Sequence, residues 1–339
     1  MIVLKKPTTN ERGVLYLYYS YVYPLLLQLF DAEAIAARYR IVVEPSWSGL
    51  CDLNVLCLTT IPQPVVVATA EPRDEAFLNR LDVGFVTGYF GGNTWVDPRV
   101  FRPIDGGEKV FDVVSVAAWS WYKRHWALFR ALSELKQRRP GLRVALVGYP
   151  AGLTKDDILR QAAHFGLDGS VTLFERLPAA QVSEILAKSR VNVLWSRREG
   201  SPRATIEGMA AGVPFVIRHG FNYGHEYDYV TPSTGAFAAE ASLSGVLDRM
   251  IAGADRGEFR PREWMLDRMT PDATTRRLNS ILRRCALENG EVWTRDIAVK
   301  VSSLDGLEYA DPRDGERFSD DYAFIAGCVG RQQANCANR

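Results

Sequence analysis

The segment SRREGSPRATIEGMAAGVP, residues 196–214, contains two carboxylates whose spacing suits the binding of hydroxyl groups. Glu199 and Glu207 lie eight positions apart, on either side of a Ser-Pro step. A carboxylate that accepts hydrogen bonds from neighbouring hydroxyl groups gains about 1.5–3 kcal/mol from each before desolvation is counted. One glutamate alone is most simply a solvated surface charge. The prediction therefore depends on what lies between the two.

A helix start is predicted between the glutamates, with Ser201 as its cap and Pro202 in its first turn. The helix is expected to end before Gly212. Unpaired N–H groups at a helix start favour an anion such as phosphate, and here they belong to Arg203 and Ala204. One glutamate then precedes the helix and the other lies inside it. A sugar, a diphosphate and a ribose in line would occupy the whole segment, which predicts a nucleotide-sugar site.

The preceding sequence predicts a sheet that positions this helix. Strands are expected over 111–117, 142–148, 171–174 and 191–196, and helices over 122–139, over 155–165 and after Pro178. The first helix is expected to bury an apolar stripe that begins at Trp126. Such repeated units form a doubly wound parallel sheet, whose ligands lie beyond the carboxyl ends of the strands. The glutamates follow one of these ends.

The first ninety residues are less regular and predict a smaller α/β domain. Its expected strands are 13–19, 39–45, 53–58, 64–69 and 82–88. The predicted organisation is an N-terminal domain over 1–92, a linker over 93–109, a second domain over 110–284, and a C-terminal tail over 285–339. The tail is expected to cross back to the N-terminal domain and to contain a closing helix near 318–330.

Composition excludes several classes of protein. The formal net charge is +1 over 339 residues, which provides no electrostatic basis for binding nucleic acid. The five cysteines form no Cys-x-x-Cys pair and no zinc-site spacing, so we expect free thiols in the cytosol and no metal. Residues 14–30 carry no charge, and Pro24 lies among them. We interpret them as a buried strand leading into an amphipathic helix, with a membrane span or a peripheral membrane contact as alternatives.

The glutamate pair and several stretches before it resemble a known family. Glu199 and Glu207 resemble the E-x7-E signature of retaining glycosyltransferases of family 4, and FDVVSVAAWSWYKRH resembles the strand and phosphate-binding lysine that open that family's donor domain, here with Lys123. VALVGYP, VTLFERLPAAQVSEILAKSRVNVLWS and NTWVDPRVFRP continue the likeness over about residues 93–237. It implies a GT-B-like α/β fold of two facing Rossmann-like doubly wound domains, the N-terminal one unusually short.

The resemblance also implies roles for individual residues. It places Glu199 at the hydroxyls of the donor sugar, Glu207 at the ribose, and Lys123 on the diphosphate, with Lys123 and Glu199 as the catalytic pair. The other residues expected around the donor are Arg124, Arg176, Ser201, Pro202, Arg203 and Ala204, with Arg176 beside the base. It further implies retention at the anomeric carbon, no metal, and no cofactor besides a nucleoside diphosphate sugar, with UDP or GDP as the leaving group.

The chain also departs from the family pattern. Many members have an arginine where this chain has Ala118, so a neighbouring arginine would have to replace that charge. The N-terminal domain contains no histidine, although many members place one near the reacting sugar. The candidates for the acceptor side or the cleft are Glu44, Trp47, His219 and His225.

The leading hypothesis is a retaining glycosyltransferase that acts on a sugar, glycolipid or small-molecule acceptor. Analogy with the family suggests a role in bacterial polysaccharide, glycolipid or glycoside biosynthesis, in the cytoplasm or at the inner face of the cell membrane. One alternative is a nucleotide-binding protein or pseudoenzyme without transfer activity. Another is a nicotinamide-dependent dehydrogenase, but no Gly-x-Gly-x-x-Gly motif follows a predicted strand.

Overall fold

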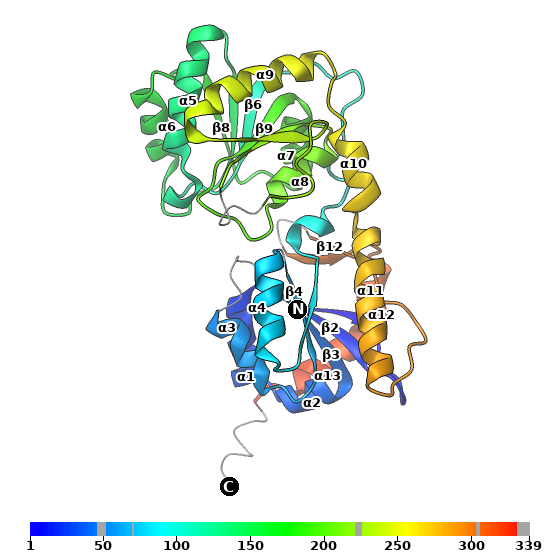
Figure 1. The fold of residues 1–339 in the computed structure, drawn as a ribbon. Helices are drawn as coiled ribbons and strands as arrows, with labels where there is room; N and C mark the ends of the chain where they lie inside the picture. The colour runs from blue at the N-terminus through cyan, green and yellow to red at the C-terminus, as the bar shows by residue number, and fades with distance from the viewer. Residues whose placement is uncertain (46–51, 70, 221–225, 303–305, 331–339) are drawn as a thin grey trace. The chain divides into compact units, whose positions relative to one another are not determined.

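The computed structural model describes residues 1–45, 52–69, 71–220, 226–302 and 306–330 (Figure 1). The chain divides into two compact units, one formed by Met1–Trp95 with Pro271–Arg339 and the other by Val96–Thr270. These limits differ from the predicted domains, because helix α11 (Pro271–Glu288) groups with the N-terminal residues. Among the described residues, no helix combines the length and the apolar character that crossing a membrane requires.

The second unit contains a parallel six-stranded sheet in the order β11-β10-β9-β6-β7-β8. Its strands are β6 (Phe111–Val116), β7 (Val144–Gly148), β8 (Val171–Glu175), β9 (Ser189–Leu194), β10 (Phe215–Arg218) and β11 (Gly235–Ala238). Strand β7 is buried along its whole length, as expected for a parallel strand covered on both faces. The strand order reverses at β6, which lies between β7 and β9. This switch point is where open α/β sheets bind ligands.

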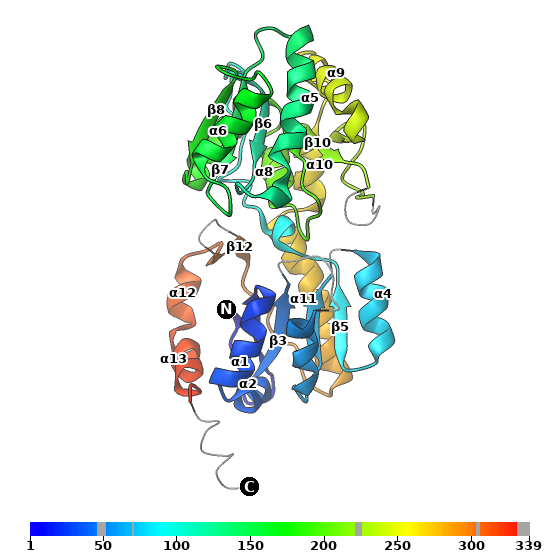
Figure 2. The ribbon, with the colours of Figure 1, turned by 90° about the vertical axis from the view of Figure 1, so that its left-hand side faces the viewer.

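Helices cover both faces of this sheet (Figures 1 and 2). Helices α5 (His125–Arg138), α6 (Lys155–His164) and α9 (Leu243–Asp255) share one hydrophobic core with Val113. Helices α7 (Ala179–Ala187), α8 (Arg203–Ala210) and α10 (Pro261–Arg268) share another core with Val114. Because successive strand residues face opposite sides, Val113 and Val114 assign the two helix layers to the two faces. The unit is therefore doubly wound, as predicted.

The first unit contains a five-stranded sheet in sequence order, in which only β1 is antiparallel to its neighbour. The strands are β1 (Ile2–Lys5), β2 (Gly13–Tyr18), β3 (Tyr39–Glu44), β4 (Val65–Ala68) and β5 (Phe85–Gly88). One face packs against α1 (Tyr23–Leu29), α2 (Ala32–Arg38), α3 (Leu53–Leu56), α4 (Pro72–Leu81) and α13 (Ser319–Gly327). The other face packs against α11 and Trp95. Figure 2 shows α13 beside α1 and α2.

Part of the C-terminal segment completes this first unit. Besides α11 and α13 it contains the strand pair β12 (Lys300–Ser302) and β13 (Leu307–Tyr309) and helix α12 (Arg313–Arg317). The Tyr39 hydroxyl donates to Asp321 Oδ1 at 2.6 Å, which ties β3 to α13. Helix α13 lies within the stretch where a closing helix was expected.

Two predictions for the N-terminal region were inaccurate or incomplete. The expected strand over 53–58 is wrong, because these residues form α3 and a 3-10 turn over Cys57–Thr60. Asp52 caps α3 by accepting from the Asn54 N–H at 2.9 Å, so a local cap prevails over a β-like composition. Strand β1 was not predicted at all. The uncharged stretch forms β2 and α1, with Pro24 in the first turn of α1.

Candidate functional site

Two loops meet where the strand order of the second unit reverses. One follows β6 and contains Lys123, and the other follows β9 and contains Glu199. Lys123 Nζ lies 2.5 Å from Glu199 Oε1, and the two side chains are 19% and 15% exposed. The Arg197 N–H donates to the Tyr122 carbonyl at 2.9 Å, so the backbone also joins the two loops. The structure thus brings together the two predicted catalytic residues.

The position of Lys123 depends on a break that the sequence did not reveal. The helix expected from residue 122 begins instead at His125, after a 3-10 turn over Trp121–Lys123. Arg124 separates the two with φ of 55°, a left-handed conformation that costs a non-glycine residue about 1–2 kcal/mol. Lys123 therefore lies at the end of the loop and not on the helix.

The loop after β6 is anchored through Trp119, which is fully buried. The Trp119 N–H donates to the Tyr149 carbonyl at 2.7 Å, and its own carbonyl accepts from the N–H groups of Ala151 and Leu153. Gly148 is required beside it, because a Cβ there would lie 2.1 Å from the Ala117 carbonyl oxygen. These contacts hold the loop against the carboxyl end of β7, before the chain reaches Lys123.

Further cations lie along the same edge of the sheet. Arg124 and Arg130 both form ion pairs with Glu240, which follows β11. Arg218, at the end of β10, donates to the carbonyls of Ser196 at 3.2 Å and Arg197 at 2.5 Å. Burial lowers the pKa of the Arg218 guanidinium, and the charge of Arg124 lowers it further. Glu240 and Arg218 were not predicted, although each lies at or just beyond a strand end.

His125 lies beneath the Lys123 loop at the start of α5 and is 2% exposed. Burial lowers its pKa to about 4, and the positive charge of Lys123 acts in the same direction, whereas a hydrogen bond with the Ser120 backbone opposes the shift. The imidazole is therefore neutral near pH 7. It adds no positive charge to the site.

The second predicted glutamate is held inside α8. Glu207 is 3% exposed, and its Oε1 lies 3.0 Å from Arg203 Nη2, one helical turn away. The Asn192 amide of β9 donates to the Ala204 carbonyl at 2.7 Å. A Cβ on Gly208 would lie 2.6 Å from that amide nitrogen, so a glycine is needed for α8 to approach β9 closely. Arg203, Ala204 and Glu207 thus belong to one rigid helix next to Glu199.

The predicted cap of this helix is wrong by one residue. The residue before α8 is Pro202, and no side chain caps the helix by a hydrogen bond. Ser201 lies one position further back and is half-buried. The other end agrees with the prediction, since Gly212 follows the helix with φ of 79°. The helix keeps its backbone N–H groups near the loop that carries Glu199.

Arg176 lies at the other side of the sheet, directly after the edge strand β8. Its backbone is left-handed, with φ of 50°, and its N–H donates to the Gly148 carbonyl at 2.9 Å. The side chain is 68% exposed and lies 3.8 Å from Glu175. It is therefore available to a ligand at the same edge, two strands away from β6.

The acceptor candidates fall into three groups. Glu44, the last residue of β3, is 1% exposed; it accepts a hydrogen bond from the Tyr16 hydroxyl and lies 3.7 Å from Lys300 Nζ. The structure thus places Glu44 in the interior of the first unit, and its predicted exposure to an acceptor is wrong. His219 is exposed, follows β10 and forms a T-shaped pair with the Phe237 ring. Trp47 and His225 lie outside the described residues.

Within the described residues, no cluster of three or more histidine, cysteine, aspartate or glutamate side chains could hold a metal ion. The arrangement provides positive potential for an anion at Lys123, Arg124 and the start of α8. Glu199 precedes the start of α8 and pairs with Lys123, and Glu207 lies within the helix and pairs with Arg203.

Comparison with known proteins links this unit to a family. Residues 99–233 match the family model described as "Glycosyl transferases group 1". A D-inositol 3-phosphate glycosyltransferase from Segniliparus rotundus is 29% identical over 183 residues, which are 46% of this chain. The matched stretch covers only 40% of the length of that relative.

Solved structures show the same fold at low identity. The sucrose-phosphate synthase of Thermosynechococcus elongatus has a TM-score of 0.62 at 16% identity, and 82% of this chain and 74% of that chain are covered. Anabaena Alr3699/HepE, solved in complex with UDP-glucose, has a TM-score of 0.59 at 14% identity, with 81% and 78% covered. Lys123, Glu199 and Glu207 all lie in the part of the chain that matches the group 1 glycosyltransferases, and the fold is the mixed α/β fold with parallel sheets of the GT-B glycosyltransferases.

Proposed function

We propose that this protein transfers a sugar from a nucleoside diphosphate sugar to an acceptor hydroxyl, with retention at the anomeric carbon. The observation that carries the proposal is the meeting of Lys123 with Glu199 at the switch point of the second sheet, beside the start of α8. Lys123 and the helix start suit a diphosphate. Glu199 and Glu207 suit the hydroxyls on its two sides.

The ion pair between Lys123 and Glu199 has a mechanistic consequence. Without a donor, each side chain compensates the charge of the other. Donor binding would break this ion pair and give each side chain a partner on the donor. Lys123 moves to the diphosphate oxygens, and Glu199 accepts hydrogen bonds from the sugar hydroxyls. Since both side chains are partly exposed, the exchange requires no uncompensated buried charge.

In the proposed transfer, the bond between the anomeric carbon and the diphosphate oxygen breaks as the acceptor oxygen bonds to the same carbon from the same face. The acceptor proton passes to an oxygen of the departing diphosphate. Lys123 and the N–H groups at the start of α8 stabilise the negative charge that develops there. Arg124, held by Glu240, adds positive potential in place of the arginine that Ala118 replaces.

Glu207 is proposed to hold the ribose hydroxyls. It is already ordered by Arg203, so its carboxylate loses little freedom when a ligand binds. Arg176 is proposed to lie beside the base, which the sequence does not identify. The UDP-glucose complex of the Anabaena protein favours a UDP-linked donor, with GDP as the alternative.

The acceptor and the setting are proposed by analogy alone. A sugar, a glycolipid or a small molecule would supply the hydroxyl, in bacterial polysaccharide, glycolipid or glycoside biosynthesis. The transfer reaction would take place in the cytoplasm or at the inner face of the cell membrane. Exposed Tyr21, Leu25 and Leu29 in and before α1 are consistent with a peripheral contact there.

A thermal-shift panel of UDP, GDP, ADP, TDP and NAD tests the donor site. A ligand at one hundred times its dissociation constant adds about 2.7 kcal/mol of stability. We expect one nucleoside diphosphate to raise the midpoint of the wild type, and Glu207→Ala to abolish the shift. Glu134→Ala, on an exposed position of α5, is the matched control and should keep the shift.

Two outcomes would contradict the proposal. If NAD alone stabilised the protein, the site would belong to a dehydrogenase. If a diphosphate bound but neither transfer nor donor hydrolysis followed with any sugar donor, the protein would be a nucleotide-binding protein without transfer activity.

A further inference from the structure

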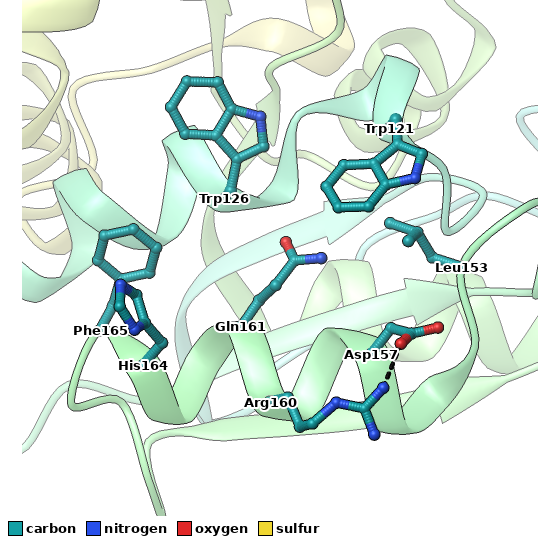
Figure 3. A pocket seen from close by; sticks show the side chains of 8 residues that line it. All are labelled: Trp121, Trp126, Leu153, Asp157, Arg160, Gln161, His164 and Phe165. Atoms are coloured by element: carbon teal, nitrogen blue, oxygen red, sulfur yellow. Dashed lines mark hydrogen bonds and ion pairs between the residues drawn. The ribbon is translucent and has the colours of Figure 1, made fainter.

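A groove in the second unit lies outside the proposed donor site and has no role in it. It is an open groove lined by residues of the 3-10 turn before α5, the first turn of α5, the loop after β7 and one side of α6 (Figure 3). Its volume of about 430 Å³ falls in the range of about 300–1,000 Å³ that small-molecule sites occupy. The groove is therefore large enough for a ligand of its own.

Two indoles form one side of this groove. Trp121 is 66% exposed and Trp126 is 37% exposed. The exposure of Trp126 corrects the prediction that it begins the buried stripe of α5, because the buried face runs through His125, Phe129 and Leu132 instead. Tryptophan is usually well buried in a folded protein. Two exposed indoles at one groove form a surface suited to a ligand with an apolar face.

A polar group between the indoles lacks a partner. Figure 3 shows the Gln161 side chain rising from α6 toward the space beneath the two rings. The Gln161 Oε1 atom is buried and accepts no hydrogen bond from any described residue. A buried acceptor without a donor costs about 1–3 kcal/mol. Because Gln161 as a whole is only half-buried, a turn of its amide toward the groove would let a ligand hydroxyl placed against the indoles supply the missing donor.

The charges around the groove favour a neutral ligand. Asp157 and Arg160 form an ion pair with each other, and Asp157 also completes the cap of α6 with Thr154. The guanidinium carbons of Arg124 and Arg130 lie 5.3 Å and 5.8 Å from the centre of the Trp126 ring. Both arginines are paired with Glu240. Neither arginine lines the groove, and the acidic and basic side chains that do line it, Asp157 and Arg160, cancel each other.

We propose that this groove binds a neutral oligosaccharide, with the apolar face of a sugar ring on the indoles and a ring hydroxyl donating to Gln161 Oε1. Sugars combine an apolar face with hydroxyl donors and carry no charge, which matches the groove on each count. Trp121 belongs to the same 3-10 turn as Lys123, so the bound sugar chain would lie next to the proposed transfer site. The groove binds this ligand whether or not a donor is present.

Binding of neutral oligosaccharides to the full chain tests this proposal directly. We would titrate maltohexaose, cellohexaose and chitohexaose without nucleotide, by isothermal calorimetry and saturation-transfer NMR. One of them is expected to bind the wild type, and Trp121→Ala and Trp126→Ala are expected to weaken it about tenfold or more. Gln161→Met, which keeps the size of the side chain, is expected to weaken binding about three- to tenfold through the lost hydrogen bond.

Leu159→Ala is the matched control, since Leu159 is an exposed residue of α6 that does not line the groove. It should bind as the wild type does. If none of the three oligosaccharides bound, or if the three groove variants bound as tightly as the wild type, the proposal would be overturned. Because Gln161→Met alters no exposed aromatic residue, it keeps the test decisive if a tryptophan variant fails to fold.

A second measurement separates the groove from the donor site. We expect the thermal shift by UDP, where the wild type shows one, to persist in Trp126→Ala and Gln161→Met. A shift lost in both variants would assign the groove to the nucleotide and overturn the oligosaccharide proposal. Oligosaccharide binding by a protein that responds to no nucleotide would support the groove while removing the proposed transferase function.

Discussion

Two lysine–glutamate pairs in this chain have the same separation and opposite surroundings. Lys5 and Glu11 in the first unit lie 2.5 Å apart and are 3% and 1% exposed, whereas Lys123 and Glu199 in the second unit lie 2.5 Å apart and are 19% and 15% exposed. Glu11 also accepts from the N–H and the hydroxyl of Thr294. Through Glu11 the first pair is tied to Thr294 of the C-terminal segment, while the second is the pair proposed to exchange its contacts for a ligand.

The difference shows that pair geometry alone does not identify a functional site. Burial lowers the pKa of the Lys5 ammonium, although Glu11 opposes the shift. The Lys5 ammonium also lies 3.2 Å from the centre of the Trp293 ring, which leaves no room for a ligand. Solvent access and neighbouring hydrogen bonds therefore separate a structural pair from a candidate binding pair.

The largest expected effect follows from removing the buried partner. Glu11→Ala would leave the Lys5 charge buried without its carboxylate, and we expect the free energy of unfolding to fall by about 3–5 kcal/mol. Glu199→Ala should change it by about 1 kcal/mol or less, because its partner can turn to solvent. Urea unfolding of the two variants measures the contrast. Equal losses would show that the two pairs do not differ as described.

For turnover we expect the reverse order, with the larger effect at the partly exposed pair of the second unit. Lys123→Ala is expected to lower turnover by roughly two to three orders of magnitude, since one preorganised charge contact to the leaving group is lost. Lys188→Ala, which breaks an exposed pair with Glu184 on α7, should leave turnover near the wild-type value. Donor hydrolysis and transfer assays give the comparison once the donor is known. Near-normal turnover of Lys123→Ala would remove this residue from the mechanism.

The acid dependence of stability tests burial in the second unit. His125 has its pKa lowered to about 4 from the ordinary value of 6.5, so between these values the unfolded chain binds a proton that the folded chain does not. Stability therefore rises with pH across this window, and the contribution present above pH 6.5 is lost as the pH falls toward 4. The full difference is roughly 3 kcal/mol.

This effect can be isolated by replacing His125 with a side chain that does not titrate. Urea unfolding at pH 7 and pH 4.5 should show a smaller acid loss for His125→Gln than for the wild type. His164→Gln, on an exposed position of α6, is the control and should lose as much as the wild type. Identical acid losses for all three proteins would mean that His125 is accessible to protons in the folded state.

The smallest effect is expected at the residue that the sequence predicted as a helix cap. Ser201→Ala should change the free energy of unfolding by less than about 0.5 kcal/mol, because no side chain caps α8. The matched variant is Thr154→Ala, which removes the real capping box of α6 and should cost about 1 kcal/mol. A loss of that size at Ser201 would restore it as the cap.

Local sequence predicted the second unit better than the first. The expected strand over 142–148 contains β7, and the expected helix over 155–165 contains α6, because each has a clear apolar period and a stop signal. The expected strand over 53–58 failed, since a short apolar run fits a helix as well as a strand. Trp126 and Ser201 were misplaced for a related reason. The two helices begin at His125 and Arg203, later than expected, and the apolar period does not report where a helix begins.

By itself the sequence determined the order of strands and helices from β6 to α8 and the placement of Glu199 and Glu207 around a helix start. It also determined that Lys123 follows the central strand. Tertiary structure alone decided which charges remain accessible. Glu44 looked like an acceptor contact and became buried, because Tyr16 and Lys300 reach it from distant parts of the chain. Exposure is set by such long-range packing, which a residue's near neighbours in the sequence do not specify.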